Sequence, residues 1–509
     1  MSAREIHAIL PLLILSGGIL FLLLQVSFLR SHKAAAATAV ITLIAAIAAC
    51  FDVARTLSQS AAPIEVTGLL LIDQQALFFC LLFLLAALAI AVLGFSYLQK
   101  RCDSARESIP EAFYLLLLLV MLGAMALVFS NHFASVFLSM ELMSLALYPM
   151  LGFAVTGDLS PRLEQMYSLE SGVKYLLLSA LSTALGLFGM ALIYAACGAL
   201  DFGGVAAAVA NLPRTPSLLL SGLTLLLITL AFKLSLVPFH IWTPDVYQGA
   251  PSPVTALIAT VGKGAVVALL LRLFTELELF SIPALTGLLA AAAVASMLVG
   301  NLLALMQKNI KRLLAYSSIA HIGYLLVAFL IGNSAFGNEA VLYYLVAYVI
   351  TTLGAFGAVG LIADSALART AGSAGEYVYT TTSPFQRDFY RGLLWRSPWL
   401  AGCLAAMLLS LAGIPLTIGF IGKFYIFAAG IQGQLWLLLA AVVIGSAIGL
   451  FYYLRLLLTM VLREPQAPLD SIESIRIAVS GRLLLISLTG VLLIFGVFPQ
   501  ILIDWIYTL

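Results

Sequence analysis

The chain has 509 residues, of which 63% are hydrophobic and only 9% are charged. Because about a quarter of the residues in soluble proteins are charged, this composition and the mean hydropathy of +1.11 exclude a string of soluble domains. The net charge of +2 is too small to indicate any class of partner. The five cysteines show no C-x-x-C spacing, which argues against a metal cluster or a disulfide framework.

Apolar runs recur along the chain with short connectors, and a helix that crosses a bilayer needs roughly 20 such residues. Fourteen spans are predicted: 5–29, 35–55, 75–98, 112–129, 131–155, 171–197, 217–240, 252–274, 282–306, 311–332, 338–363, 398–430, 434–462 and 483–506. Only Ser130, Asn131 and His132 separate the fourth from the fifth, so we expect a tight turn there. The first lacks a basic region followed by a small-residue cleavage site, so we expect it to be retained. The expected fold class is all-α integral membrane, with a single polytopic domain over residues 1–509.

The seventh and twelfth helices are expected to be broken. Lys233 precedes Pro238 by five residues in the seventh, and Lys423 follows Pro415 by eight residues in the twelfth. Proline removes a backbone donor and clashes with the preceding turn. Opened backbone is tolerated at membrane depth only where it is buried in protein or lines a watery cavity, so each break should hydrate its lysine.

The two broken helices occupy equivalent places in two five-helix units. Helices four to eight form the first unit, 112–274, and helices nine to thirteen form the second, 282–462. Since five is odd, the units would have opposite topology, which is the inverted repeat of many transporters. Helices one to three (1–100) and helix fourteen (483–506) flank the repeats.

Lysine and arginine outside the spans predict the orientation. Most of them lie in loops that follow odd-numbered helices, for example Lys100, Lys311 and Arg312, and few lie on the other side, for example Arg55. The first side is therefore expected in the cytoplasm, which leaves both termini outside.

Ionisable residues inside the spans are the candidate functional residues: Glu141, Lys174, Lys233, Lys263 and Lys423. One such residue at the centre of a membrane costs about 2.5–3.5 kcal/mol on insertion scales, so a simple anchor would not retain five. For Lys174, near its helix entrance, extension to the headgroups is an equal alternative. For Glu141, the alternative is a purely structural pair with a lysine.

Four further residues are weaker candidates. His321 has a titration range that suits proton transfer, although a lone histidine among helices more often satisfies a hydrogen bond; the same holds for His132. His240 could equally anchor the chain at the membrane interface beside Trp242, and Arg455 is expected to extend to the headgroups.

These residues suggest a relay. Burial and a nearby carboxylate act in opposite directions on the proton affinity of a lysine. A charge moving past Glu141 and Lys233 would therefore change the affinity of Lys233, and a released proton could pass toward Lys263 and Lys423.

Four stretches resemble one known family: MELMSLALYPMLGF (140–153), AFKLSLVPFHIWTPDVYQGAPSPVTALIATVGKGA (231–265), NIKRLLAYSSIAHIGYLLV (309–327) and LSLAGIPLTIGFIGKFYIF (409–427). They are similar to the N subunits of bacterial respiratory complex I, NADH-quinone oxidoreductase, within the antiporter-like subunits. Three features favour subunit N over the related subunits M and L: the sequence PDVYQG, a lysine in the twelfth helix, and an end after helix fourteen.

The resemblance implies Glu141 and Lys233 as the pair of a first half-channel, Lys263 as the connecting residue and Lys423 as the residue toward the outer exit. Lys174 matches a further family lysine, and His321 stays a possible relay member. The 157–172 loop and the 364–397 linker look longer than the family pattern.

The predicted function is that of a proton-translocating subunit in the bacterial inner membrane, assembled with other membrane-arm subunits and no nucleic acid. The chain itself is expected to hold no cofactor or metal, because NADH, FMN, iron–sulfur clusters and a quinone would bind elsewhere in the enzyme. Two alternatives stay open: a cation/proton antiporter subunit without redox input, and a structural spacer that conducts nothing.

Overall fold

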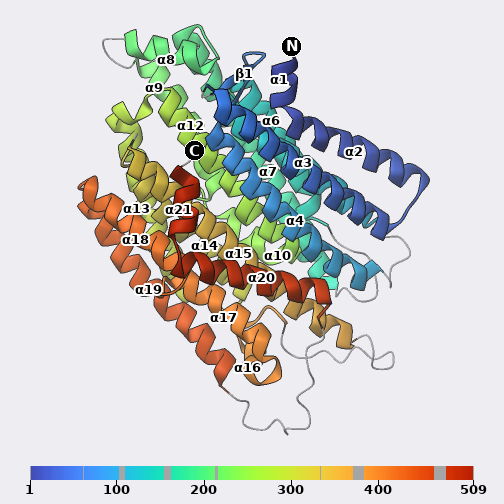
Figure 1. Ribbon diagram of the computed structural model, residues 1–509. Coiled ribbons are helices and arrows are strands. Elements are labelled where there is room, and N and C mark those ends of the chain that lie inside the picture. The colour runs from blue at the N-terminus through green and yellow to red at the C-terminus, as the bar shows by residue number, and fades with distance from the viewer. Residues whose placement is uncertain are drawn as a thin grey trace.

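Long apolar helices, most of them running side by side, form almost all of this protein, as the computed structural model shows (Figure 1). The structure describes residues 2–60, 62–102, 109–153, 162–211, 216–332, 334–370, 383–462 and 477–507. Among these residues, thirteen helices are long and apolar enough to cross a bilayer. Two shorter helices together cover the predicted twelfth span, so the expected fold class is confirmed.

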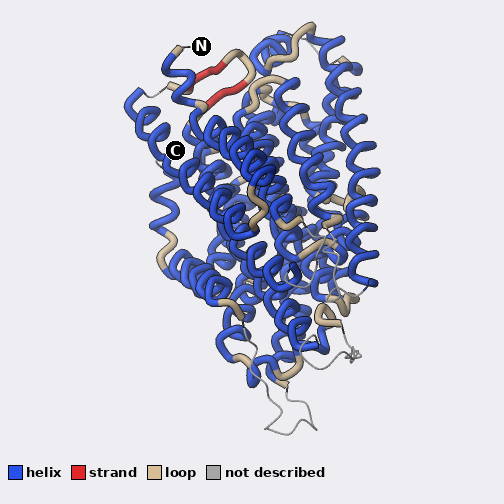
Figure 2. Tube along the Cα trace, turned by 90° about the vertical axis from the view of Figure 1, so that its right-hand side faces the viewer, coloured by secondary structure: helices blue, strands red, loops and turns tan. Residues whose placement is uncertain are grey.

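The N-terminal part consists of α1 (Ala3–Ala8), α2 (Leu10–Phe28), α3 (His32–Ser60), a two-stranded antiparallel hairpin of β1 (Ile64–Val66) and β2 (Leu70–Ile72), and α4 (Gln74–Cys102). The expected first span, 5–29, is therefore split at Ile9. The hairpin was not predicted, because three-residue strands are too short to show a period of two. It lies at the end of the molecule that carries the N-terminus (Figure 2).

The next part, which contains the first expected repeat, consists of α5 (Glu111–Phe129), α6 (Phe133–Leu151), α7 (Arg162–Cys197), α8 (Phe202–Asn211), α9 (Ser217–Leu234), α10 (Trp242–Gly249), α11 (Ser252–Leu257), a π-helical segment η1 (Ile258–Gly262), α12 (Lys263–Glu276) and the 3-10 turn η2 (Leu279–Ser281). The tight turn between α5 and α6 is confirmed. By contrast, α7 begins nine residues before the predicted 171, so much of the expected 157–172 loop is helical; residues 154–161 lie outside the described part.

The part that contains the second expected repeat consists of α13 (Pro283–Leu305), α14 (Ile310–Phe329), α15 (Ala335–Thr370), η3 (Arg387–Tyr390), α16 (Leu393–Arg396), α17 (Pro398–Ala412), α18 (Ile418–Gln432) and α19 (Trp436–Val461). The chain closes with α20 (Val479–Val497) and α21 (Gln500–Tyr507), so the predicted last span is split near Pro499. The expected linker at 364–397 is shorter than predicted, since α15 extends to Thr370 and short helices form from Arg387.

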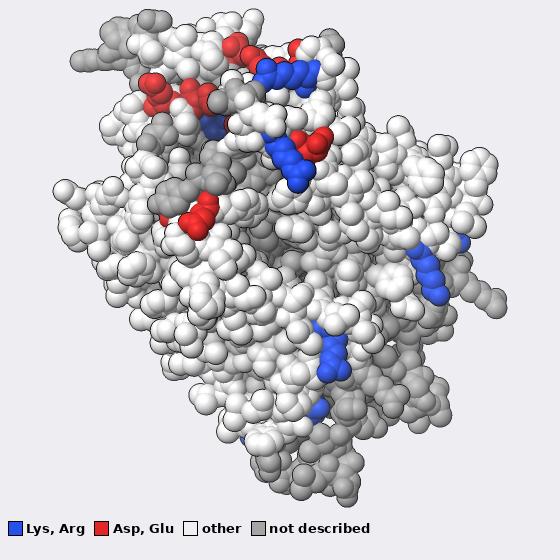
Figure 3. Space-filling model, in the orientation of Figure 1, with Lys and Arg blue, Asp and Glu red and all other residues white. Residues whose placement is uncertain are grey.

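Burial divides the helices into central and peripheral ones. The percentages here are the share of buried residues in the most apolar 18-residue stretch of each span. In Ser252–Glu276 and Ala335–Ser365 this share is 100%, whereas it is only 17% in α2 and 22% in α20. Large apolar side chains such as Phe28 and Leu20 are exposed on the outer helices. Figure 3 shows that acidic side chains gather at the end that carries α8 and β1, above a broad and mostly uncharged face, which suits contact with lipid.

Small residues bring the helices of the bundle close together. A methyl group added to Gly189 of α7 would lie 2.7 Å from the carbonyl oxygen of Gly222 in α9, and one added to Gly222 would lie equally near that of Gly189. Such close backbone approach is how helices associate in lipid, where the hydrophobic effect between helices is absent. It fixes α9, and with it Lys233, against α7.

Candidate functional site

The first broken helix ends before its proline. Leu236 donates its backbone N–H to Ala231 O (2.8 Å) and Ser235 donates to Phe232 O (3.0 Å), while Ser235 takes the left-handed conformation with φ +63°. These two bonds form a Schellman motif, which satisfies carbonyls at a helix end. The predicted break is confirmed, but α9 stops at Leu234, four residues before Pro238.

Three side-chain bonds hold the opened segment in place. Trp242 donates its indole N–H to Phe232 O (3.0 Å), Thr243 donates its hydroxyl to Ser235 Oγ (2.6 Å), and the hydroxyl of Ser296 in α13 accepts from Val237 N (2.9 Å). Because buried backbone groups must find partners, these residues stabilise the break. The bond from Val237 to Ser296 also joins the break to α13, which belongs to the second expected repeat.

Lys233 occupies the last turn of α9 and is 4% exposed. Its amine donates to Ser144 Oγ (2.5 Å) and to Ser179 Oγ (2.7 Å), and Tyr148 donates its hydroxyl to the same Ser179 oxygen (3.0 Å). The ring of Tyr175 lies 5.5 Å from the amine. A buried cation therefore meets hydroxyl groups, which can both accept and donate a proton.

Glu141 lies three residues before Ser144 in α6, so both side chains share one helix face. No ion pair joins Glu141 to Lys233 in the part of the chain that the structure describes. Instead, Glu141 Oε1 is buried without a hydrogen-bond partner. Ser144, which accepts from the amine of Lys233, thus lies on the same face of α6 as Glu141.

Lys174 joins a surface ion network that centres on Asp245 of α10. Its amine contacts Glu170 (2.6 Å) and Asp245 (2.8 Å), and Arg312 of α14 contacts the other Asp245 oxygen (2.6 Å) and Gln248 (3.0 Å). Burial alone would raise the pKa of Asp245, but the bonds and charges of Lys174 and Arg312 hold it below the usual range. The Lys174 side chain is 40% exposed, which matches the headgroup alternative rather than deep burial.

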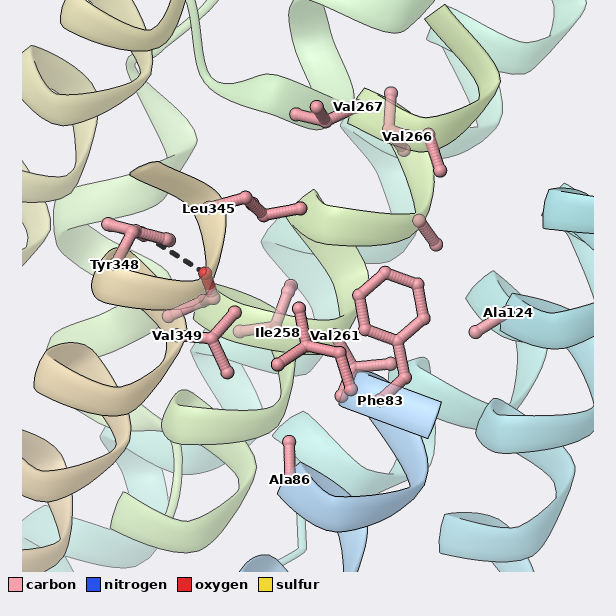
Figure 4. Close-up of a cluster of buried hydrophobic side chains, with 14 of the residues drawn as sticks. Phe83, Ala86, Ala124, Ile258, Val261, Val266, Val267, Leu345, Tyr348 and Val349 are labelled. Carbon is pink, nitrogen blue, oxygen red and sulfur yellow. Dashed lines mark hydrogen bonds between the residues drawn. The ribbon is translucent and has the colours of Figure 1, made fainter. Parts of the chain in front are cut away.

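Lys263 is fully buried at the start of α12, directly after the π-helical segment η1. Its amine donates to Ser318 Oγ (2.7 Å), which also bonds the hydroxyl of Tyr348 (2.7 Å). Tyr348 in turn donates to Ala259 O (3.0 Å), within η1. In Figure 4, Tyr348 lies at one side of a buried apolar cluster and Phe83 lies at the other. The π-helical turn shifts the hydrogen-bond register of the helix, and Tyr348 bonds a carbonyl within it.

His321 continues the same face of α14 three residues after Ser318. Its Nδ1 bonds the hydroxyl of Tyr344 (2.6 Å), and its Nε2 lies 3.4 Å from the hydroxyl of Tyr453. Tyr344 and Tyr348 are four residues apart on α15, so each faces one of the two α14 groups. We call Ser318, His321, Tyr344 and Tyr348, together with Tyr324 of α14, the polar ladder.

The ladder ends at Asn301 of α13. Asn301 donates its amide to Tyr324 (2.8 Å) and accepts from Tyr452 (3.1 Å). The amine of Lys423 lies 5.3 Å from the ring of Tyr324. Buried hydroxyl, imidazole and amide groups therefore lie in a row between Lys263 and Lys423, and His321, a possible relay member, is one of them.

The second broken helix repeats the ending of the first. Ile414 donates to Leu409 O (3.0 Å) and Gly413 donates to Ser410 O (3.0 Å), with φ +84° at Gly413. Lys423, on the resumed helix α18, donates its amine to Ala412 O (2.9 Å). A cation is favoured there because carbonyls at a helix C-terminus carry partial negative charge.

Gly413 also makes room for that lysine. A methyl group added to it would lie 2.8 Å from Lys423 Cδ and 3.3 Å from Nζ, which is tighter than carbon atoms normally approach. Glycine is thus required twice, for its positive φ and for the space that the Lys423 side chain fills.

The structure also involves residues that sequence reasoning missed or misplaced. Lys311 was counted as a loop charge, but it is 1% exposed, donates to Ala250 O and lies 4.8 Å from the ring of Phe385. This interpretation was wrong because other segments of the chain cover Lys311. From the sequence alone, a lysine at the start of a helix is expected at the membrane interface. Asp245 had no signal in the sequence beyond its place in the PDVYQG block.

The remaining weak candidates lie at the margins. His132 caps α6 by accepting from Ala134 N (3.0 Å), which is a structural role. His240 has a buried, unpartnered Nδ1 in the opened segment. Arg455 is exposed on α19, and no cluster of three metal-binding side chains occurs among the described residues.

The fold and the site define the class of antiporter-like membrane subunits, with two broken helices joined by buried amines and hydroxyls. Residues 130–449 match the family described as NADH:quinone oxidoreductase/Mrp antiporter, TM. The chain is 43% identical over 507 residues to NADH-quinone oxidoreductase subunit N of Methylococcus capsulatus, covering 99% of this chain and 95% of the relative. The chain therefore belongs to the NADH:quinone oxidoreductase/Mrp antiporter transmembrane family.

Two solved structures share the fold. A chain of respiratory complex I from Thermus thermophilus, with bound aureothin, is 32% identical with a TM-score of 0.77, covering 97% of this chain and 98% of that one. A chain of the Mrp complex from Dietzia is 18% identical with a TM-score of 0.83, covering 100% and 97%. The second likeness concerns the fold alone.

Proposed function

We propose that this chain is a proton-translocating membrane-arm subunit of an NADH:quinone oxidoreductase. The observation that carries this proposal is the row of buried amines and proton-exchanging groups from Lys263, along the polar ladder, to Lys423. Ring contacts join its hydrogen-bonded pairs: His321 lies 6.0 Å from the Tyr348 ring and 5.6 Å from the Tyr324 ring, measured between ring centroids. Hydroxyl and imidazole groups can accept a proton on one side and donate one on the other. Apolar side chains at these positions would cost less energy in a membrane, so the buried polar groups indicate a function.

In this mechanism Glu141, Lys233, Lys263 and Lys423 exchange protons in turn. The amine of Lys233 loses or gains a proton through Ser144 and Ser179, which are its two acceptors. Glu141 sets the charge next to Ser144 and so determines when Lys233 holds its proton. Lys174 stabilises the cytoplasmic surface through Asp245, and His321 is a member of the relay.

The redox chemistry belongs to partner subunits. The name of the Methylococcus relative is that of an NADH-quinone oxidoreductase subunit. NADH, FMN, iron–sulfur clusters and the quinone would bind to other subunits, and this chain contributes proton export. The paired lysines are then driven by charge changes that reach them along the membrane arm.

The proposed orientation places α10, the start of α14 and the end of α15 on the cytoplasmic side of a bacterial inner membrane, with both termini outside. Arg312, Arg387 and Arg396 lie at that end, in line with the excess of positive charge in cytoplasmic loops. Residues 112–274 and 282–462 would be the inverted repeats, and the matching Schellman endings of α9 and α17 support this.

The test uses the assembled complex in liposomes. Lys233→Ala, Glu141→Ala and Lys423→Ala should each lower proton pumping on the order of tenfold or more, since each removes a positioned proton-transfer group. NADH oxidation with an artificial acceptor reports assembly, and exposed Arg455→Ala serves as the control with unchanged pumping. A normal proton-to-electron ratio in assembled Lys233→Ala would overturn the proposal and favour the spacer.

The second candidate is a cation/proton antiporter subunit without redox input, favoured by the likeness of fold to the Mrp chain. It predicts that sodium gradients move protons through the purified complex in the absence of NADH. Pumping that requires NADH and a quinone, and that is indifferent to sodium, would exclude it.

A further inference from the structure

Tyr247 of α10 carries a buried hydroxyl that the packing does not use. The residue is fully buried, and its hydroxyl oxygen has no hydrogen-bond partner among the described residues. Such a hydroxyl has lost its bonds to water and gained none in return, which destabilises a folded protein. Phenylalanine would fill the same space without that loss. A hydroxyl kept under these conditions therefore calls for a reason other than stability.

The amine of Lys263 lies beside this tyrosine. It is 5.8 Å from the centre of the Tyr247 ring and 2.7 Å from Ser318 Oγ, to which it donates. The two hydroxyls belong to different helices, Tyr247 to α10 and Ser318 to α14. Because a lysine amine is carried on a flexible four-carbon stem, it can turn from one of these groups to the other.

The hydroxyl hydrogens on the Ser318 side are already committed. Tyr348 has one hydroxyl hydrogen and gives it to Ala259 O (3.0 Å), so Ser318 must be the donor in the 2.7 Å bond between the two hydroxyls. Ser318 therefore has only lone pairs left for Lys263. It can accept from the charged amine, which has three hydrogens and no lone pair, but it has no hydrogen to give to a neutral amine.

Tyr247 offers what Ser318 lacks. Its hydroxyl hydrogen has no acceptor in the part of the chain that the structure describes, and a neutral amine has a lone pair that accepts such a hydrogen. Both hydroxyl oxygens can accept from the charged amine, but only Tyr247 can also donate to the neutral one. The two hydroxyls therefore differ in which protonation state of Lys263 they stabilise.

We propose that Tyr247 holds the amine of Lys263 in its neutral state, and that the amine alternates between Tyr247 and Ser318 as it gains and loses a proton. The inference rests on the proposed function and adds to it the residue that lets Lys263 give up its proton. Tyr247 lies on the side of the first half of the relay. Its ring centroid is 6.2 Å from that of Trp242, which is 4.8 Å from that of Tyr175, beside the first amine.

Each cycle moves one proton and uses no oxidant. The neutral amine accepts a proton on its lone pair and gains one N–H bond, which ends its bond with the hydroxyl hydrogen of Tyr247. The charged amine then donates to Ser318. Release toward the polar ladder breaks one N–H bond and returns the lone pair to nitrogen. A cavity lined in part by Ser318, Tyr348 and Phe356 has room for about one water molecule, which can replace the amine at Ser318.

The first test compares Tyr247→Phe with Tyr390→Phe. Tyr390, in η3 against α19, is also fully buried with an unpartnered hydroxyl, so both variants should keep or gain thermal stability. In the assembled complex in liposomes, NADH-driven pumping should fall about fivefold in Tyr247→Phe, which corresponds to one hydrogen bond. Tyr390→Phe should pump as wild type. Equal pumping in the two variants would overturn the inference.

The pH profile separates this role from damage to the packing. Without the Tyr247 hydroxyl the neutral amine has no donor, so Lys263 holds its proton more tightly and releases it only at higher pH. The pumping optimum of Tyr247→Phe should therefore move to more alkaline pH, and the deficit should shrink there. A deficit that is equal at every pH would indicate a packing defect and overturn the inference.

Other titratable and charged groups lie on the elements packed around Tyr247 and Lys263, and they are the same in both variants. They are Lys174 and Tyr175 of α7, Lys233 of α9, Asp245 of α10, Lys311, Arg312 and His321 of α14, Tyr348 of α15, Cys80 of α4, and Glu111 and Tyr114 in the first turn of α5. A shift of the profile that occurs in Tyr247→Phe and not in Tyr390→Phe therefore reports the Tyr247 hydroxyl.

Ser318→Ala removes the other position of the amine and should shift the profile the opposite way. The charged amine loses an acceptor, so it gives up its proton more readily and fails to capture one at alkaline pH. Pumping should therefore fall most at high pH, and the optimum should move toward acid pH. A shift in the same direction as that of Tyr247→Phe, or none, would refute the two positions.

The outcomes separate this inference from the proposed function. If Lys263→Ala pumps normally, the relay itself fails, whatever Tyr247 does. If Lys263→Ala lowers pumping while Tyr247→Phe behaves as Tyr390→Phe does, the relay stands and the inference is wrong. Because Tyr247 acts through Lys263, adding Tyr247→Phe to Lys263→Ala should lower the residual pumping no further. A further loss in that double variant would overturn the inference.

Discussion

The two broken helices end in the same way but hold their lysines differently. Both α9 and α17 finish in a Schellman motif, with Ser235 and Gly413 in the left-handed conformation. Lys233 precedes its break and donates to two side-chain hydroxyls, whereas Lys423 follows its break and donates to the main-chain oxygen of Ala412. One amine thus depends on rotatable groups and the other on a fixed helix end.

This difference assigns distinct properties to the two amines. Serine hydroxyls can turn away and interrupt the path of Lys233, while the carbonyl of Ala412 stays in place as long as α17 ends there. The first break is also more deeply enclosed: Lys233 and Ser235 are buried, whereas Lys423 and Gly413 are partly exposed in the isolated chain. We infer that the first half of the relay is controlled by side chains and the second by backbone geometry.

The largest expected effect comes from removing both hydroxyls of the first amine. Ser144→Ala combined with Ser179→Ala leaves the buried amine of Lys233 without either hydrogen bond, so pumping should fall nearly as far as in Lys233→Ala, on the order of tenfold. Pumping by the assembled complex checks this. Exposed Ser487→Ala is the control, and full pumping in the double variant would contradict control by side chains.

Next in size is Gly413→Ala, which alters the second break through its backbone. A positive φ costs an L-residue roughly 1–2 kcal/mol, and the added methyl group would push the Lys423 side chain away from Ala412. Pumping should drop severalfold and the thermal midpoint should fall. Gly402→Ala in the same helix is the matched control, since its methyl group meets nothing within 4 Å. Equal behaviour of the two variants would refute the role assigned to Gly413.

Trp242→Phe tests how the first break is stabilised. The ring remains, but the indole N–H that bonds Phe232 O is lost, and that carbonyl keeps the bond from Ser235. The free energy of unfolding should therefore fall by about 1 kcal/mol, measured by denaturation of the purified complex. The exposed Trp436→Phe should change nothing measurable. An equal loss in both would mean that the indole bond does not matter.

The smallest expected effect is that of Asp245→Asn, which releases α10, just after the first break, from Lys174 and Arg312. The Asp245 side chain is 38% exposed, so each ion pair contributes only about half a kcal/mol after screening. Because its pKa is lowered in the folded protein, this stabilisation is fully present above the ordinary aspartate pKa of about 3.9. It is lost as the pH falls through the lowered folded value.

Stability of wild type and Asp245→Asn, compared by thermal unfolding across pH, checks that sign. The difference should be constant from neutral pH down to the ordinary aspartate range and vanish below it. A difference that already disappears near neutral pH would show that the ion pairs do not set the pKa of Asp245.

Much of the fold could be predicted from the chain because lipid imposes simple rules. A span needs about 20 apolar residues, so most of the helices, and the tight turn near Asn131 between two of them, could be predicted from the sequence. Pro238 and Pro415 marked the two breaks, although the actual ends at Leu234 and Ala412 follow from Schellman motifs that proline alone does not specify. The split at Ile9 was not predicted, although Pro11 lies in the first turn of α2.

The candidate site was less predictable where it depends on partners distant in sequence. Lys263 could be found as a buried charge, but its bond to Ser318 spans 55 residues. The π-helical turn before it has no composition signal. Lys311 read as a loop charge because only the fold brings Phe385 and Ala250 over it.

The sequence by itself determined that this protein crosses a bilayer many times, that two helices open beside lysines, and which family it resembles. These follow from composition, proline and local spacing, each of which acts within a few residues. Only the tertiary structure decided that hydroxyls, rather than Glu141, bond Lys233 directly, and that α14 and α15 align their polar groups into a ladder. Those contacts depend on helix rotation and packing, which are set by the whole bundle.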